Sequence, residues 1–313
     1  MVDGEIFRVF EMTGILISTF DRQEVLARWT AARIRLLWPG HPPVFFSGLT
    51  SRDEGSLGFE GDSRDWMNVN LQAVRQLIEL GFQRAYLILD DHPPVGACHA
   101  GYLNARLPEL SDNLQAAYIG LLGYGQHRRR EGEILGAAED FLEHSLPTYR
   151  WKFSLHPGLW NLEDLKALLE CRMEKYPPGQ RSPWNFERHR DVPGDPRVDS
   201  LAGRCFRVCG SSCLAPDAGA RAALVFESAL RLLADTELFA AKLAGGKAAR
   251  DSAELRRLWM FGHYLGPYPI FWSGCMRQGN PHADFEKWLA WFGPSELKAA
   301  WNPLSGGRER AGL

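Results

Sequence analysis

The sequence predicts an α/β fold in which a mostly parallel sheet is flanked by helices. Three short apolar runs in the first third of the chain, "GILIST", "VFFSGL" and "RAYLILDD", are bounded by polar residues or glycine, which is typical of buried strands. Between them lie two longer segments whose apolar residues recur at helical spacing. Strands that alternate with helices over short connections favour a parallel sheet wrapped by crossover helices.

The signals that end each element support this order. The first helical pattern stops at "PGHPP", because proline cannot continue a helix. The second stops at Gly81, a residue type that favours the end of a helix. The predicted elements cover residues 14–19, 23–38, 44–49, 66–81 and 84–91.

The middle of the chain is expected to combine a helix, a loop and a strand without the regular alternation of the first third. A helix is expected after Asn161, which can cap it with Asp164 in the capping-box position. The stretch 176–196 is too rich in proline for regular structure and predicts a loop, whereas 204–213 predicts a returning strand.

Helical patterns dominate the chain after that strand. They cover Asp217 to Leu243 and 253–265, and an aromatic-rich tail follows, which we expect to cover the core. We therefore expect one domain over 1–215 and a helical, aromatic-rich C-terminal extension over 216–313 that packs on the same domain.

Composition excludes several classes of protein. The 313 residues carry 36 Lys and Arg against 38 Asp and Glu, a net charge of −2, so a wide phosphate-gripping surface for nucleic acid is not expected. No signal peptide or membrane span is evident, which favours a cytoplasmic protein. Cys205, Cys209 and Cys213 are spaced by four, but without a second ligand pair, so buried reduced thiols are favoured over a metal site.

The most informative feature is the pair Asp90–Asp91 at the end of an apolar run. In parallel sheets the ligand crevice lies beyond the carboxyl ends of the strands. Ser18, Thr19 and Asp21 follow the first predicted strand, so they should converge with the pair. Adjacent carboxylates suit Mg²⁺ or Mn²⁺. Neighbouring His92 is a candidate third ligand, although a lone histidine before two prolines is more often solvated. A pair that caps a helix or orders a loop is an equally weighted alternative.

Several segments together resemble a family of bacterial glycosyltransferase-like proteins associated with surface polysaccharide synthesis. They are "ILISTFD", "PPVFFSGL", "DWMNVNLQAV", "LILDDHPP", "YRWKFSLHPGLWNLEDL" and "SPWNFE", which span Ile15 to Glu187. The resemblance implies a GT-A-like (Rossmann-like) fold, that of nucleotide-diphospho-sugar transferases. It also implies metal-dependent transfer of a sugar from a nucleotide-diphosphate donor to a hydroxyl acceptor, with inversion.

The resemblance also implies roles for particular residues. Asp90 and Asp91 would bind Mn²⁺ or Mg²⁺, which stabilises the leaving diphosphate. Glu187 would be the general base that takes the proton from the acceptor hydroxyl. The remaining expected ligands are Ser18, Thr19, Asp21, Trp66 and Asp90 for the donor, and His156 and Trp184 for a glycan or lipid-linked acceptor.

Two other hypotheses remain open on the sequence alone. His156 and Asn185 stand where the family pattern has glutamine and an acid, so the chain could be an inactive GT-A-like scaffold in polysaccharide assembly. The second hypothesis is a different metal-dependent phosphoryl or nucleotidyl transferase built on a similar sheet. The sequence has no P-loop motif, which disfavours the P-loop version of such an enzyme. Peripheral contact with a membrane is a further expectation, which the basic run at 127–130 would favour.

Overall fold

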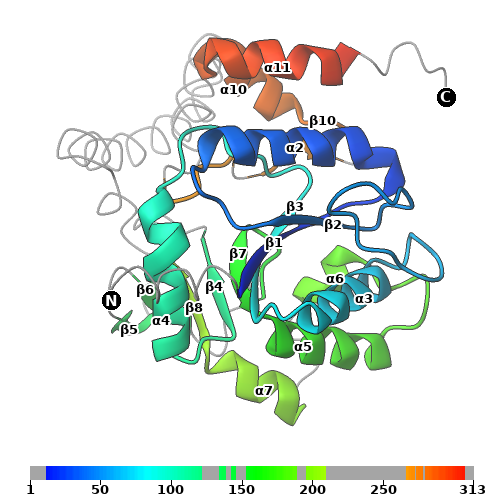
Figure 1. Ribbon diagram of the computed structural model, residues 1–313, viewed down its shortest axis with the longest axis vertical. Coiled ribbons are helices and arrows are strands. Elements are labelled where there is room, and N and C mark those ends of the chain that lie inside the picture. The colour runs from blue at the N-terminus through cyan, green and yellow to red at the C-terminus, as the bar shows by residue number, and fades with distance from the viewer. Residues whose placement is uncertain are drawn as a thin grey trace, which may run out of the picture.

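The computed structural model describes residues 12–121, 134–138, 142–145, 153–188, 195–208, 266–271, 273–277 and 279–306. Within these residues an eight-stranded sheet has helices on both faces (Figure 1). The strands are β1 (Thr13–Ser18), β2 (Val44–Ser47), β3 (Arg84–Leu89), β4 (Tyr118–Gly120), β5 (Ile134–Ala138), β6 (Leu142–Ser145), β7 (Gly158–Asn161) and β8 (Cys205–Val208), with a separate pair β9 (Met276–Arg277) and β10 (Asn280–Pro281). The helices are α2 (Glu24–Leu37), α3 (Trp66–Glu79), α4 (Leu107–Asn113), α5 (Leu162–Lys175), α6 (Pro183–Glu187), α7 (Pro196–Ala202), α10 (Ala283–Phe292) and α11 (Ser295–Gly306), and short turns η1 (Asp21–Gln23) and η2 (Tyr102–Arg106) complete the set.

Strand β1 lies in the middle of the predicted parallel unit, which the structure confirms. It pairs in parallel with β2 on one side and with β3 on the other. Side chains alternate across a strand. Accordingly, Ile15 and Ile17 join the cluster that contains α2, whereas Leu16 joins the cluster that contains α3. The two crossover helices therefore cover opposite faces of the sheet.

The sheet as a whole is mixed, which corrects part of the expectation. Its strand order is β2-β1-β3-β7-β4-β8-β6-β5. Strand β7 is antiparallel to both β3 and β4, and β6 is antiparallel to both β8 and β5. The other six strands run in one direction, so most of the sheet is parallel in direction although it contains reversed neighbours. This architecture is consistent with a GT-A-like fold.

The proline-rich stretch 176–196 contains regular structure, so the prediction of a loop throughout was wrong. Helix α6 begins after Ser182, whose side chain accepts a hydrogen bond from the N–H of Asn185 (3.3 Å). Helix α7 begins in the same way after Asp195. Each has proline at its first turn, where the missing N–H leaves no hydrogen bond unmade. These prolines start helices instead of breaking them.

Other predicted ends and caps were confirmed. Gly81 follows α3 with φ +90°, a left-handed conformation that glycine adopts without steric cost. The side chain of Asn161 accepts a hydrogen bond from the N–H of Asp164 (3.1 Å) and so caps α5. The carboxylate of Asp164 binds Arg204 instead of completing a capping box.

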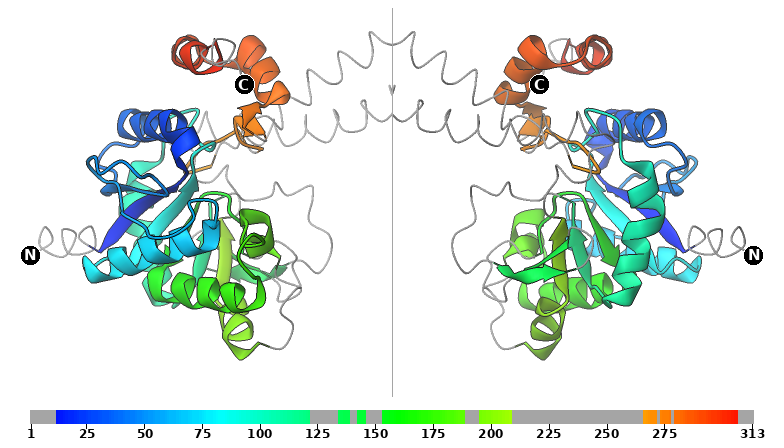
Figure 2. Two further views of the ribbon diagram at one scale, coloured as in Figure 1. Left: turned by 90° about the vertical axis from the view of Figure 1, so that its right-hand side faces the viewer. Right: turned by 90° about the vertical axis from the view of Figure 1, so that its left-hand side faces the viewer.

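Helices α10 and α11 pack against α2, on the side away from the sheet (Figure 2). The rings of Trp29 and Trp301 lie 5.5 Å apart between centroids. Trp288 is buried with Trp301, which agrees with the expected covering of the core, whereas Trp291 is exposed. The division at 215/216 stays a prediction.

Several predicted features lie outside the described residues. They are the helical patterns over 217–243 and 253–265, the basic run 127–130, Cys209 and Cys213. Of the three cysteines spaced by four, Cys205 is described, and its buried thiol donates to the carbonyl of Leu201 (3.3 Å). Among the described helices, none combines the length and apolarity that a membrane crossing requires.

Substitution of Gly158 by alanine tests the packing of the reversed strand β7. A Cβ at this position would overlap the ring of Tyr118, which is itself packed on Trp160 (centroids 4.4 Å apart). We expect Gly158→Ala to lower the free energy of unfolding by about 1–3 kcal/mol, the usual cost of overpacking a core. Urea unfolding followed by circular dichroism measures this, and an unchanged midpoint would contradict the packing described.

Candidate functional site

The carboxyl ends of the neighbouring strands β1 and β3 lie at a topological switch point, where successive connections lead to strands on opposite sides of β1. From β1 the chain crosses to β2 on one side and then returns to β3 on the other. Ligands bind at such switch points in open α/β sheets. The two strand ends are joined there, because the Thr19 hydroxyl donates to Asp90 Oδ2 (2.6 Å) and the Asp90 N–H donates to the Ser18 carbonyl (3.2 Å).

Asp90 lies in an environment that disfavours its charge. Burial and the neighbouring charge of Asp91 raise the pKa of Asp90 to about 7, although the hydrogen bond from Thr19 acts in the opposite direction. The backbone of the same residue is held from α2, where the Thr30 hydroxyl donates to the Asp90 carbonyl (2.6 Å). Two carboxylates are therefore kept side by side where neither is fully solvated.

Asp91 fixes the orientation of His92. Asp91 Oδ1 lies 2.8 Å from His92 Nδ1, and His92 is buried. Burial lowers the pKa of His92. The hydrogen bond to Asp91 and the charges of Asp91, Asp90 and Glu187 together more than offset this, so the pKa is raised overall. Because Nδ1 faces the carboxylate, Nε2 is the ring atom left for another contact. Within the described residues, this buried Nε2 has no hydrogen-bond partner.

Glu187 lies in a second polar group formed by residues before β7. Its Oε1 accepts hydrogen bonds from the N–H of Leu155 (2.7 Å) and from the Ser154 hydroxyl (3.4 Å). Burial raises the pKa of Glu187, and the two hydrogen bonds reduce this effect. Ser154 Oγ also lies 2.7 Å from His156 Nδ1. Ser154 is a site residue that the sequence analysis missed, since an isolated serine in "KFSLHPG" has no distinguishing pattern.

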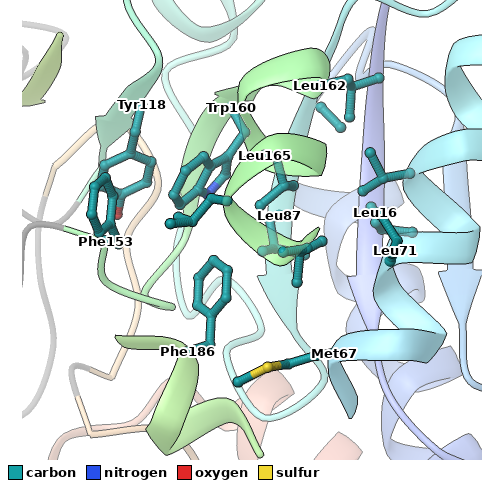
Figure 3. Close-up of a cluster of buried hydrophobic side chains, with 14 of the residues drawn as sticks. Leu16, Met67, Leu71, Leu87, Tyr118, Phe153, Trp160, Leu162, Leu165 and Phe186 are labelled. Atoms are coloured by element: carbon teal, nitrogen blue, oxygen red, sulfur yellow. The ribbon is translucent and has the colours of Figure 1, made fainter. Parts of the chain in front are cut away.

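Apolar neighbours anchor this second group in the core. Phe186 points from α6 toward Trp160, and Met67 of α3 lies beside it (Figure 3). The Phe186 ring is 6.1 Å from that of Trp160 and 5.4 Å from that of Trp66. On the other segment, Phe153 stacks on Trp160 at 6.3 Å. Ser154 and Glu187 thus each follow directly after a buried aromatic residue.

The two imidazoles connect the acidic pair to Glu187. The rings of His92 and His156 lie edge to face with centroids 5.4 Å apart. The polar side chains therefore form one continuous series from Asp91 through both histidines and Ser154 to Glu187. The fold thus brings together residues predicted for the metal, acceptor and base positions.

The remaining predicted residues are more scattered. Ser18 is buried at the end of β1, and among the described residues its hydroxyl has no hydrogen-bond partner. Asp21 Oδ1 accepts from the N–H of Thr50 (2.8 Å), which joins the loops after β1 and β2. Trp66 packs on Phe186, on the Glu187 side of the site, and Trp184 is 71% exposed on the same short helix as Glu187.

The donor set of the acidic pair fits a divalent cation in part. Asp90 and Asp91 supply carboxylate oxygens, the ligands that Mg²⁺ and Mn²⁺ prefer. Burial and the charge of Asp91 both disfavour ionised Asp90, as its raised pKa indicates, and a bound cation would offset both effects. In the described part of the chain, no group of three or more His, Cys, Asp or Glu side chains is arranged to hold a metal. The remaining ligands would have to come from a bound substrate and water.

Comparisons with known proteins provide little further information. No protein-family model matches the chain, and the search of curated proteins finds no match. A crystal structure of S. aureus TarS is similar with a TM-score of 0.31 and 9% sequence identity, over 96% of this chain and 75% of TarS. A TM-score this low does not establish a common fold.

Replacement of Asp90 tests the electrostatics of the pair. The pKa of this carboxyl is 3.8 without perturbation and about 7 in the folded protein, so its contribution to stability is lost as the pH rises between these values. In EDTA we expect Asp90→Asn to be more stable than the wild type at pH 8, by up to about 4 kcal/mol for a shift of about three units. At pH 4 the two should differ little.

Urea unfolding at both pH values measures this difference, with Asp199→Asn on the exposed side of α7 as the control. A wild type that is as stable as Asp90→Asn at pH 8 would contradict the strain at the acidic pair.

Proposed function

We propose that the protein is a glycosyltransferase that moves a sugar from a nucleotide-diphosphate donor to a hydroxyl acceptor, with a divalent metal and with inversion. The observation that carries the proposal is the continuous polar series that joins Asp90 and Asp91, at the switch point of the sheet, to the buried Glu187. One end suits a diphosphate with its cation, and the other suits a general base.

The donor would bind across the ends of β1 and β3. The crevice beyond a switch point accommodates nucleotides in many α/β proteins. Ser18 and Thr19 lie at its edge, and the buried Ser18 hydroxyl has no hydrogen-bond partner among the described residues. Asp21 orders the neighbouring loop through Thr50, so it would shape the nucleotide side of the site without having to contact the donor.

Asp90 and Asp91 would hold Mn²⁺ or Mg²⁺. When bound, the cation supplies positive charge that stabilises the departing nucleoside diphosphate. The protein's own part is to present two carboxylates at a fixed spacing, with Asp90 held by Thr19 and Asp91 by His92. Both hydrogen bonds limit the rotation of the carboxylates before any ligand arrives, so little ordering remains to be done on binding.

Glu187 would take the proton from the acceptor hydroxyl as that oxygen attacks the sugar. A base works best when its pKa approaches the working pH, and burial raises the pKa of Glu187 in that direction. The N–H of Leu155 and the hydroxyl of Ser154 both bind Oε1 and fix the carboxyl group. Oε1 therefore accepts both hydrogen bonds, which leaves Oε2 to take the proton.

The acceptor would lie on the Glu187 side of the site. The indole of Trp184 is exposed three residues before Glu187, and an exposed aromatic ring would stack on the face of a sugar ring. His156 completes the polar surface between Glu187 and His92. A glycan or a lipid-linked glycan is the acceptor class that an aromatic platform beside a carboxyl base suits. Contact with a membrane surface belongs to the lipid-linked case.

Binding of nucleotides tests the metal and donor parts of the proposal. We expect isothermal titration with UDP, GDP, CMP and dTDP to show binding of at least one nucleotide that requires Mn²⁺ or Mg²⁺. Asp91→Asn should weaken it at least about tenfold, because one charged ligand of the cation is lost. Asp199→Asn is the matched control on exposed α7. No metal-dependent binding across the panel would contradict the proposal.

Replacement of the base tests the chemistry. Glu187→Gln should keep the donor affinity and lose about 10²–10⁴-fold in turnover, measured as release of nucleoside diphosphate from the donor. Glu163→Gln, on the exposed side of α5, is the control. Unchanged turnover in Glu187→Gln would remove Glu187 from this role. A wild type that binds donors but neither transfers nor hydrolyses them would instead favour the scaffold hypothesis.

A further inference from the structure

A segment near the end of the chain lies against the acidic loop, residues 90–92, which carries Asp90 and Asp91. This C-terminal strap, defined here as the described residues of 266–277, forms an isolated bridge between Ile270 and Pro94. The N–H of Val95 donates to the Pro269 carbonyl (2.8 Å), and the N–H of His99 donates to the Pro267 carbonyl (2.8 Å). The strap therefore runs beside the chain that follows the acidic pair.

The strap also binds the acidic loop itself, through backbone carbonyls. The N–H of Cys275 donates to the Asp91 carbonyl (2.8 Å). The hydroxyl of buried Tyr268 donates to the His92 carbonyl (3.1 Å). On the other side, α2 binds the Asp90 carbonyl through Thr30. Three consecutive carbonyls are thus held from two elements that are distant in sequence.

Gly274 brings the strap against the Asp91 side chain as well. A Cβ built on Gly274 would lie 2.5 Å from Asp91 Oδ2, and the residue has φ +76°. Both the conformation and the space require glycine here. The backbone at 274 thus limits where the Asp91 carboxylate can point, in addition to the hydrogen bond between that carboxylate and His92.

We propose that the C-terminal strap is a positioning element of the candidate site, in which Tyr268 fixes the acidic loop and Gly274 sets the direction of the Asp91 carboxylate. The strap touches neither donor nor acceptor in this role. It acts through Asp91 and His92. The geometry of the acidic loop is a property of the folded chain alone, and only the effect on ligand affinity rests on the proposed function.

Tyr268→Phe tests the first contact and has a closely matched control. Tyr86 is also buried, packs its ring on Trp38 as Tyr268 does, and donates its hydroxyl to a backbone carbonyl, that of Leu103. Tyr86→Phe therefore removes the same kind of hydrogen bond away from the acidic loop. In hydrogen exchange of the full-length protein, peptides with the Val95 and Cys275 amides should exchange about tenfold faster in Tyr268→Phe and not in Tyr86→Phe.

Gly274→Ala tests the second contact. The added methyl should turn the Asp91 carboxylate away, and we expect the Kd for nucleotide with Mn²⁺ to rise about tenfold or more, with Asp199→Asn unchanged. Gly81→Ala is the matched control, since Gly81 has φ +90° but open space around it. It should show the backbone strain, as a lower unfolding midpoint, without loss of affinity.

The two readouts separate the strap from the function. Equal exchange at Val95 and Cys275 in Tyr268→Phe and Tyr86→Phe would overturn the positioning role, whatever the protein binds. If the wild type binds no nucleotide with metal, the proposed function fails, and the exchange experiment still decides the role of the strap. If the wild type binds and Gly274→Ala binds equally well, the control of Asp91 by Gly274 is wrong.

Discussion

The repulsion between Asp90 and Asp91 is the constraint on which the site depends. Neighbouring carboxylates with restricted access to water are unfavourable when both are charged, and here this raises the pKa of Asp90 to about 7. Compensation comes both from the next residue in the chain and from the end of a neighbouring strand. The protein supplies a hydroxyl to one carboxylate and an imidazole to the other, from Thr19 and His92. Such unfavourable groups persist where the surrounding structure holds them firmly, which is a common property of functional sites.

The hydrophobic core fixes the Glu187 end of the site, because buried aromatic residues and polar site residues are adjacent in the chain. Phe153 and Phe186 are fully buried around Trp160, and the residues that follow them, Ser154 and Glu187, join the polar series. Tight packing restricts the aromatic rings to one arrangement. Each polar residue is bonded directly to a residue that carries such a ring, so its own position is restricted as well. The hydrophobic cluster in Figure 3 is therefore part of the framework of the site.

Local patterns explain what the sequence could predict. The strands at β1 and β3, the helices between them and the convergence of Thr19 with Asp90 follow from periodicity and from a general rule for parallel sheets. Helix α6 carried a signature, serine before proline, that the proline content of the stretch obscured. The reversal of β7 and the contact of Tyr268 with His92 have no such signature, because both are long-range pairings without local periodicity. Their prediction would need information on contacts that one sequence lacks.

The strap has a consequence for how the protein is made. Tyr268 reaches back 176 positions to the His92 carbonyl. During translation, the parallel strands can assemble while the ribosome is still adding later residues, but the acidic loop lacks its last restraints until residues beyond 275 have emerged. Nascent chains therefore carry the two carboxylates without their final geometry until the strap has been synthesised.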